Sequence, residues 1–116
     1  MNKERNKEKW VDYLPISFMV GNHLFNVIQY DELYDEDGNY NYGQFDYNNL
    51  TINIRLSKDG NEDNLLHKEI VLNSFWHEMF HIFNYLWNTD ADESLAQSFA
   101  NFMRELESTV EYAKKK

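Results

Sequence analysis

The four glycines and the single proline of this 116-residue chain all lie within residues 1–60, and none follows them. These two residue types interrupt helices and shape turns, so their distribution divides the chain into two parts of different character. The first part can hold strands joined by turns, whereas the second can continue as long helices. We therefore predict an α+β chain in which the strands precede the helices.

Within the first part, β-branched and aromatic residues gather in four short segments. Segments 16–20 and 23–30 are separated by a Gly-Asn dipeptide that is typical of a hairpin turn. The alternation of apolar and polar residues is clearest in segment 50–56, and a shorter strand is expected at 43–47. These segments predict a small antiparallel sheet of three to four strands.

From about Asp63 onward, apolar residues recur every three or four positions, as on one face of a helix. This first predicted helix is long and mostly buried, and it extends to Trp87. A connection over residues 88–92 leads to a second helix, whose apolar stripe ends at Val110. We expect a sheet followed by two packed helices in a single domain, residues 1–116, because a chain of this length supports one compact core.

The charges are distributed unevenly along the chain. Seven of the eleven basic residues lie at the two ends, residues 1–12 and 112–116, which we expect to be frayed. Between Trp10 and Ala113, four basic residues remain against eighteen acidic ones, so this body carries a net charge of −14. Such a surface repels phosphate backbones, and we expect it to favour basic peptides and to bind no nucleic acid directly.

The chain contains no cysteine, so it offers no thiolate ligand for a metal and no disulfide. The N-terminal stretch carries acids and a proline where a signal peptide would need an unbroken apolar run. No segment has the roughly eighteen consecutive apolar residues of a membrane span. We therefore expect a cytoplasmic protein without membrane contact, in which any metal ion would be held by His, Asp or Glu.

The sequence His-Glu-x-x-His at residues 77–81 is the strongest candidate for chemistry. On a helix, His77 and His81 lie one turn apart, so that their imidazoles can bind one cation. Glu78 lies to the side of this pair, where it can reach a water molecule on the ion. Zinc lowers the pKa of bound water to about 7, and a neighbouring carboxylate can take its proton. The motif therefore predicts a Zn²⁺ site suited to hydrolysis.

By composition alone, this motif would occur by chance in about one chain in a hundred of the same histidine and glutamate content. The surroundings sharpen the interpretation, because two histidines and a glutamate among apolar neighbours are costly to bury without polar partners. A third metal ligand is needed, and Asp90, Asp92 and Glu93 are the candidates. Helical geometry does not choose among them, and Asp90 with Glu93 also has the spacing of a helix capping box.

The segment 93–100, "ESLAQSFA", resembles the E-x-x-A-x-x-F-A signature that follows HExxH in the ImmA/IrrE-like metallopeptidases. Upstream, the strand around 25–27, the Gly-x-x-Asp turn at 43–46 and the "TINI" strand at 51–54 are similar to the short phage and prophage members of that group. The resemblance runs from about residue 15 to residue 105, and so covers most of the chain.

The resemblance implies a minimal zincin-like fold that acts on a peptide or protein substrate. It implies that Glu93 is the third zinc ligand beside His77 and His81, and that Glu78 is the general base. In zincins generally, the strand just before the HExxH helix borders the cleft and pairs with the substrate. If this chain is similar, that strand lies within residues 51–56.

Motif and resemblance together predict a small zinc metalloendopeptidase. Two alternatives stay open at this point. The first is a catalytically weak or inert zincin-fold module that binds a host or regulatory protein. The second is an acidic phage-type inhibitor that mimics nucleic acid, which is compatible with the net charge but leaves the HExxH motif unexplained.

Overall fold

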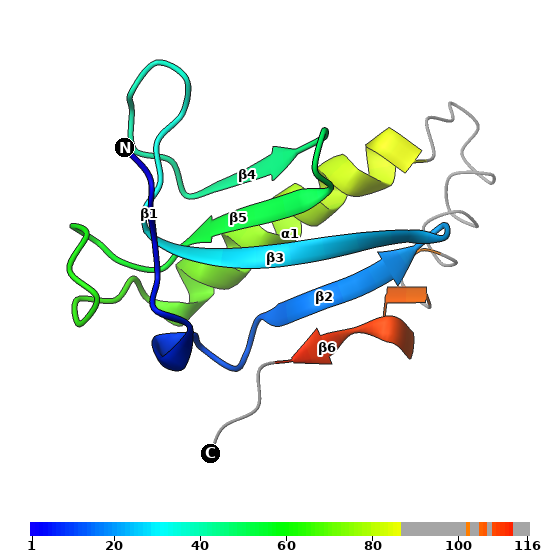
Figure 1. The fold of residues 1–116 in the computed structure, drawn as a ribbon, viewed down its shortest axis with the longest axis horizontal. Helices are drawn as coiled ribbons and strands as arrows, with labels where there is room; N and C mark the ends of the chain where they lie inside the picture. The colour runs from blue at the N-terminus through cyan, green and yellow to red at the C-terminus, as the bar shows by residue number, and fades with distance from the viewer. Residues whose placement is uncertain (87–101, 103–104, 107, 113–116) are drawn as a thin grey trace.

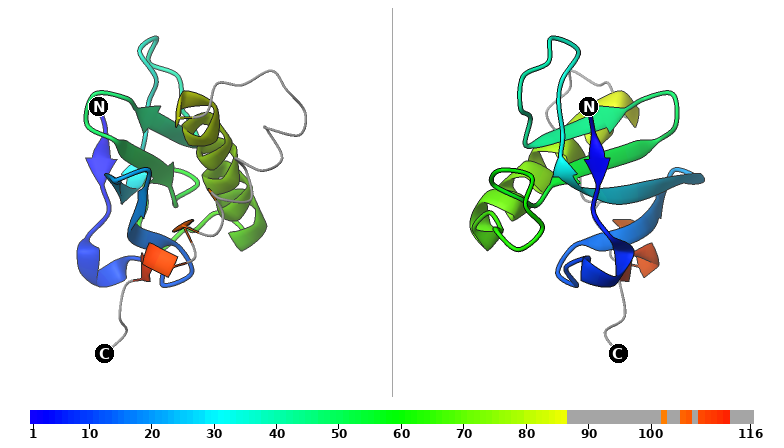
Figure 2. Two further views of the ribbon diagram at one scale, coloured as in Figure 1. Left: turned by 90° about the vertical axis from the view of Figure 1, so that its right-hand side faces the viewer. Right: turned by 60° about the vertical axis from the view of Figure 1, so that its left-hand side comes forward.

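The computed structural model describes residues 1–86, 102, 105–106 and 108–112. They form an α+β fold in which the helix α1 lies across one face of a mixed six-stranded sheet (Figures 1 and 2). The elements are β1 (Lys3–Glu4), the 3₁₀ helix η1 (Lys7–Lys9), β2 (Pro15–Val20), β3 (His23–Glu32), β4 (Gly43–Asp46), β5 (Thr51–Arg55), α1 (Lys68–Leu86) and β6 (Glu111–Tyr112).

The sheet has the order β4-β5-β3-β2-β6, and β1 pairs with the second half of β3. β2 and β3 form the predicted hairpin, in which Gly21 and Asn22 have φ angles of 57° and 66°. Two consecutive positive φ angles are characteristic of a type I′ hairpin turn. β4 and β5 form a second hairpin that folds back along the sheet, so β5 lies between β4 and β3. β4 is therefore an edge strand and β5 an interior one.

The prediction of an antiparallel sheet of three to four strands is right only in part. The predicted strands are present, but β5 runs parallel to β3, with Val27 opposite Ile52 and Gln29 opposite Ile54. The strands β1 and β6, of two residues each, complete the sheet. Alternation shows which face a strand buries but not the direction of its neighbour, and two residues are too few to carry a pattern.

The hydrophobic core lies between the sheet and α1. Phe25 and Val27 of β3, together with Ile52 and Ile54 of β5, are almost completely buried in it. α1 contributes apolar side chains at three- and four-residue spacing, so the helix and the sheet cover matching faces. The buried apolar side chains of α1 are Val71, Phe75, Met79, Ile82 and Phe83.

α1 begins at Lys68, and not near Asp63 where the apolar periodicity starts. The amide of Leu66 donates a hydrogen bond to the carbonyl of Leu56 at 2.7 Å, which keeps the preceding segment against the end of β5. His67 then caps the helix, because its Nδ1 accepts a hydrogen bond from the amide two residues later at 3.3 Å. The periodicity therefore extended the predicted helix over residues that form a turn and a bend at Asp63 and Asn64 and a β-bridge between Leu65 and Ser57.

Most of the predicted second helix falls outside the described residues. Phe102 and Leu106, two members of its apolar stripe, are helical and buried. Phe102 packs edge-on against Phe83 of α1, with ring centroids 5.7 Å apart. The C-terminal end was expected to be frayed; Tyr112 belongs to β6, and residues 113–116 are not described. In the described part of the chain, no helix combines the length and apolar character needed to cross a membrane.

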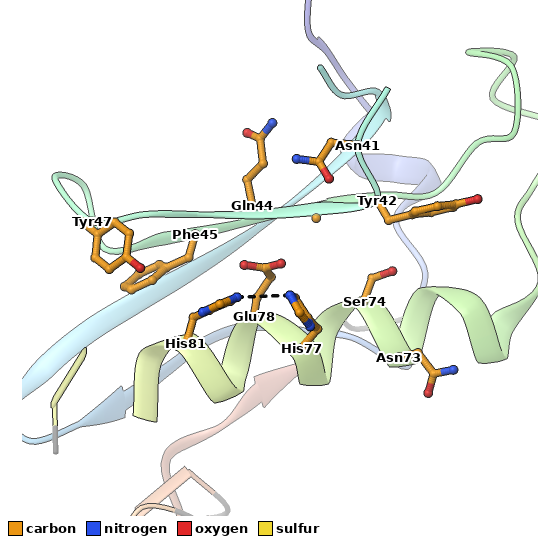
Figure 3. A pocket seen from close by; sticks show the side chains of 11 residues that line it. Asn41, Tyr42, Gln44, Phe45, Tyr47, Asn73, Ser74, His77, Glu78 and His81 are labelled. Atoms are coloured by element: carbon orange, nitrogen blue, oxygen red, sulfur yellow. Dashed lines mark hydrogen bonds between the residues drawn. The ribbon is translucent and has the colours of Figure 1, made fainter. Parts of the chain in front are cut away.

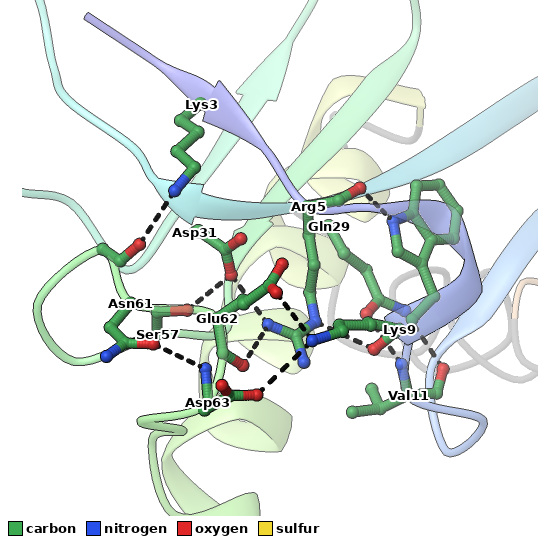
Figure 4. Close-up of polar contacts among 12 residues, drawn as sticks. Lys3, Arg5, Lys9, Val11, Gln29, Asp31, Ser57, Asn61, Glu62 and Asp63 are labelled. Atoms are coloured by element: carbon green, nitrogen blue, oxygen red, sulfur yellow. Dashed lines mark hydrogen bonds and ion pairs between the residues drawn. The ribbon is translucent and has the colours of Figure 1, made fainter.

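The N-terminal segment, residues 1–12, differs from the expected frayed end (Figure 4). β1 pairs with β3, and Arg5 is only 5% exposed. The Arg5 guanidinium forms an ion pair with Asp31 at 2.7 Å and donates hydrogen bonds to the carbonyls of Lys9 and Glu62, each at 2.9 Å. A basic end of the chain is thus tied to the sheet by a buried arginine, whose partner the sequence does not reveal.

We expect Arg5→Ala to lower the free energy of unfolding by about 3–5 kcal/mol, because it leaves the Asp31 carboxylate buried without its cationic partner. Lys58→Ala is the matched control, since it removes the same charge from an exposed side chain and should change stability by less than about 0.5 kcal/mol. Urea unfolding followed by circular dichroism measures both values. Equal effects of the two substitutions would contradict the anchoring role of Arg5.

Candidate metal centre

α1 carries a polar stripe beside its buried apolar face. Ser74, Glu78, His81 and Tyr85 follow one another at three- and four-residue spacing, and His77 lies next to them. This side of the helix borders a cleft of about 650 Å³ between α1 and β4 (Figure 3). The cleft is lined by Asn41, Tyr42, Gly43, Gln44, Phe45 and Tyr47 on one side and by Asn73, Ser74, His77, Glu78 and His81 on the other.

His77 and His81 converge on one point in the cleft. Their Nε2 atoms are 3.1 Å apart and form a hydrogen bond in which one imidazole is the donor, and the planes of the two rings are 82° to each other (Figure 3). Two nitrogens that each lie 2.0–2.1 Å from one tetrahedral zinc ion would be about 3.3 Å apart, so the observed separation fits a shared metal ion. Both side chains reach solvent, His77 as an exposed residue and His81 as a half-buried one.

Glu78 is the buried member of the motif, with 6% of its surface exposed. Its carboxyl group points toward β4, on the β4 side of the line that joins the two imidazoles (Figure 3). Burial raises the pKa of this carboxyl, while the charges of the nearby His81 and His77 act in the opposite direction. A carboxylate whose pKa is raised from its usual range is a better proton acceptor near neutral pH.

Gly43 of β4 lies directly over Glu78. A Cβ atom at this position would lie 3.3 Å from Cγ and 3.4 Å from Oε2 of Glu78, and 3.2 Å from Cδ1 of Ile54. The strand approaches the carboxylate this closely because position 43 has no side chain. Gly43 was predicted to open a Gly-x-x-Asp turn at 43–46, whereas these residues form β4, and its contact with Glu78 was not predicted. A glycine at the start of an expected strand is the signal that the sequence offers.

β4, and not the strand within residues 51–56, borders the cleft, because β5 is enclosed between β4 and β3. The amide of Arg55 donates to the carbonyl of Tyr42 at 2.9 Å. In an antiparallel ladder of this register, the backbone groups of Gly43 and Phe45 point away from β5. Among the described strands, none pairs with β4 on that side. Within the described residues, the cleft therefore has a strand edge whose outward backbone donors and acceptors pair with no other strand.

The apolar neighbours of the motif are less buried than expected. Phe75 and Phe83 belong to the core, but Trp76 is 46% exposed and Phe80 is 56% exposed. α1 is thus buried on one face and open on the other. Glu78 is buried because β4 packs close to it, and not because aromatic side chains surround the helix.

The third metal ligand that the motif requires remains a prediction. Among residues 1–86 and the described part of 102–112, no three His, Asp or Glu side chains are grouped so that they could hold a metal ion. The three candidates Asp90, Asp92 and Glu93 all lie outside the described residues. The structure therefore brings together His77, His81 and the proposed base, and it does not place Glu93.

No protein-family model, no curated protein and no solved structure matches this chain. The case for a function therefore depends on the arrangement of its own residues. The site combines two converging imidazoles, a buried carboxyl group beside them and the edge of β4.

A double-mutant cycle can measure the contact between Gly43 and Glu78. We expect Gly43→Ala to lower the free energy of unfolding by about 1–3 kcal/mol, because the added methyl group meets Glu78 and Ile54. In a Glu78→Ala background, which removes Cγ and the carboxyl group, the same change should cost at least about 0.5 kcal/mol less. Urea unfolding in the presence of a chelator gives all four values, and a coupling energy of zero would refute the contact.

Proposed function

We propose that this protein is a zinc-dependent metallopeptidase that hydrolyses peptide bonds. His77 and His81 hold the ion, and Glu93 is the third ligand that the resemblance to the ImmA/IrrE-like metallopeptidases favours. The observation that carries the proposal is the pair of Nε2 atoms 3.1 Å apart beside the buried carboxyl group of Glu78. Neutral imidazoles next to a carboxylate are the ligand and base set of hydrolytic zinc sites.

Zinc, when bound, supplies a Lewis acid that polarises the substrate carbonyl and lowers the pKa of water. Glu78 handles the proton. Its carboxylate accepts a proton from the attacking water as the water oxygen adds to the carbonyl carbon, and it returns this proton to the amide nitrogen as the C–N bond breaks. Burial raises the pKa of Glu78, which favours its use as both acceptor and donor near neutral pH.

The edge of β4 supports an extended peptide as the substrate. The free N–H and C=O groups of Gly43 and Phe45 can pair with a peptide that adds as a further strand, in the way that many proteins bind extended segments. A peptide bound there passes over Glu78, since Gly43 lies directly above that side chain. Backbone pairing of this kind fits hydrolysis of peptide bonds with little dependence on most of the side chains.

A minimal zincin-like fold is part of the same proposal. The order of the elements supports it, because β1 to β5 precede an HExxH helix that crosses one face of the sheet. The resemblance leads us to expect a strand along the cleft, within residues 51–56. In this chain β4 takes that place, because β5 lies inside the sheet.

We expect Glu78→Gln to retain bound zinc and to lose hydrolysis by roughly 10²–10⁴-fold, because the amide cannot take up the proton. His77→Ala should lose both the zinc and the activity. His23→Ala, at an exposed position in the β2–β3 hairpin, is the control and should keep both. Elemental analysis measures the metal, and mass spectrometry of a peptide mixture measures cleavage.

A Glu78→Gln protein as active as the parent would rule out the proposed mechanism. One zinc ion per chain without cleavage of any peptide would instead favour the alternative of an inert zincin-fold binding module. Binding of a basic partner that survives removal of the metal would favour the inhibitor that mimics nucleic acid.

A further inference from the structure

We propose that Phe45, Tyr47 and Tyr85 form a subsite for an aromatic or large aliphatic side chain of the peptide substrate. We call these three residues the aromatic wall. The proposal rests on the proposed function, because it takes the cleft between α1 and β4 as the place where a peptide binds. It adds a preference that neither the HExxH motif nor the backbone edge of β4 provides.

The wall is assembled from two parts of the chain, the end of β4 with its following turn and the last turn of α1. The ring centroids of Phe45 and Tyr47 are 4.5 Å apart, those of Tyr47 and Tyr85 are 5.2 Å apart, and those of Phe45 and Tyr85 are 5.9 Å apart. All three separations lie in the range of favourable aromatic contacts. Phe45 also packs against the core, whereas Tyr47 is 52% and Tyr85 is 51% exposed. The core therefore holds the Phe45 ring in place, while the rings of Tyr47 and Tyr85 are accessible to a ligand.

The wall stands at the His81 end of the cleft. Phe45 and Tyr47 line the cleft, and Figure 3 shows both of them on the side of His81 that lies away from His77. Tyr85 follows His81 by one turn of α1 and packs against both rings. At the other end, the lining combines the single ring of Tyr42 with the polar side chains of Asn41, Asn73 and Ser74 (Figure 3). The cluster of three aromatic rings is thus confined to the His81 end.

The turn after β4 holds Tyr47 in place. The carboxylate of Asp46 accepts hydrogen bonds from the amide of Asn48 at 3.0 Å and from the side chain of Asn49 at 2.7 Å. These hydrogen bonds, first of all the one from the Asn49 side chain, lower the pKa of the Asp46 carboxyl. The Asp46 carboxylate therefore stabilises the turn. It does not line the cleft.

Strand pairing determines which peptide side chain meets the wall. Residues directly opposite each other in a sheet project to the same face, and Phe45 faces the helix side together with its partner Ile52. A peptide residue opposite Phe45 therefore projects toward the wall. The residue opposite Gly43 lies over Glu78. In an antiparallel peptide, the residue at the wall precedes the residue over Glu78 by two positions, or about 7 Å.

The charges around the cleft favour a neutral side chain at the wall. Among the described residues that line the cleft, the acidic and basic groups are those of His77, Glu78 and His81 alone. The net charge of −14 over the body of the chain is thus not concentrated at this site. Burial of apolar area and contact between aromatic rings are the favourable terms that the wall offers. This differs from the preference for basic peptides that the overall charge suggested.

Calorimetric titration of the full-length protein in a chelator, which prevents cleavage, tests the subsite. The probes are four eight-residue Gly/Ser peptides, capped at both ends, with Phe, Ala, Lys or Glu at one central position. We expect the Phe peptide to bind about tenfold more tightly than the Ala peptide. Tyr47→Ala should reduce this ratio to about twofold or less. Tyr112→Ala, a 50% exposed tyrosine in β6, is the matched control and should leave the ratio unchanged.

The same peptides are then incubated with the zinc-loaded protein, and the cut sites are mapped by mass spectrometry. Cuts on the C-terminal side of Phe support the antiparallel placement on β4, and cuts on its N-terminal side overturn it. Equal affinity for all four peptides, tightest binding of the Lys peptide, or no binding at about 1 mM overturns the aromatic wall. Preferential binding of the Phe peptide without any cleavage would contradict the peptidase function and support the subsite. Cleavage without a preference for Phe would support the peptidase function and contradict the subsite.

Discussion

The packing of α1 across the β4–β5 hairpin is the contact on which the candidate site depends. Ile52 and Ile54 of β5 share one core with Met79 and Ile82 of α1. Burying a side chain of this kind contributes roughly 1.5–3 kcal/mol, so the core fixes the rotation of α1 about its own axis. The neighbouring stripe of the helix must then face β4. The two imidazoles are thus positioned by a core to which they do not belong, and Glu78 lies where that core meets the cleft.

Local sequence patterns predicted where the strands and the helix lie better than they predicted which strands pair with each other. The Gly21-Asn22 hairpin and the strand at 51–55 follow from turn chemistry and from alternation, both of which act over a few residues. The parallel pairing of β3 with β5 depends on how a second hairpin folds back, and no short pattern encodes that choice. The burial of Arg5 likewise depends on Asp31, which lies in a different strand.

The same distinction applies to the site. One helical turn separates His77 from His81, so the sequence alone predicts that they share a face. Gly43 and Tyr47 line the cleft because the β4–β5 hairpin lies beside α1, and no local pattern encodes that placement. The strand that borders the cleft was assigned to the wrong half of the hairpin for this reason. Glu93 lies outside the described residues and stays a prediction.

The most direct test is X-ray absorption at the zinc edge of the protein loaded with one equivalent of zinc. We predict a four-coordinate ion with two imidazole nitrogens at about 2.0–2.1 Å and oxygen atoms in the remaining positions. A six-coordinate ion surrounded by oxygen atoms alone, or a protein that releases its zinc on dialysis, would contradict the assignment of His77 and His81 as metal ligands.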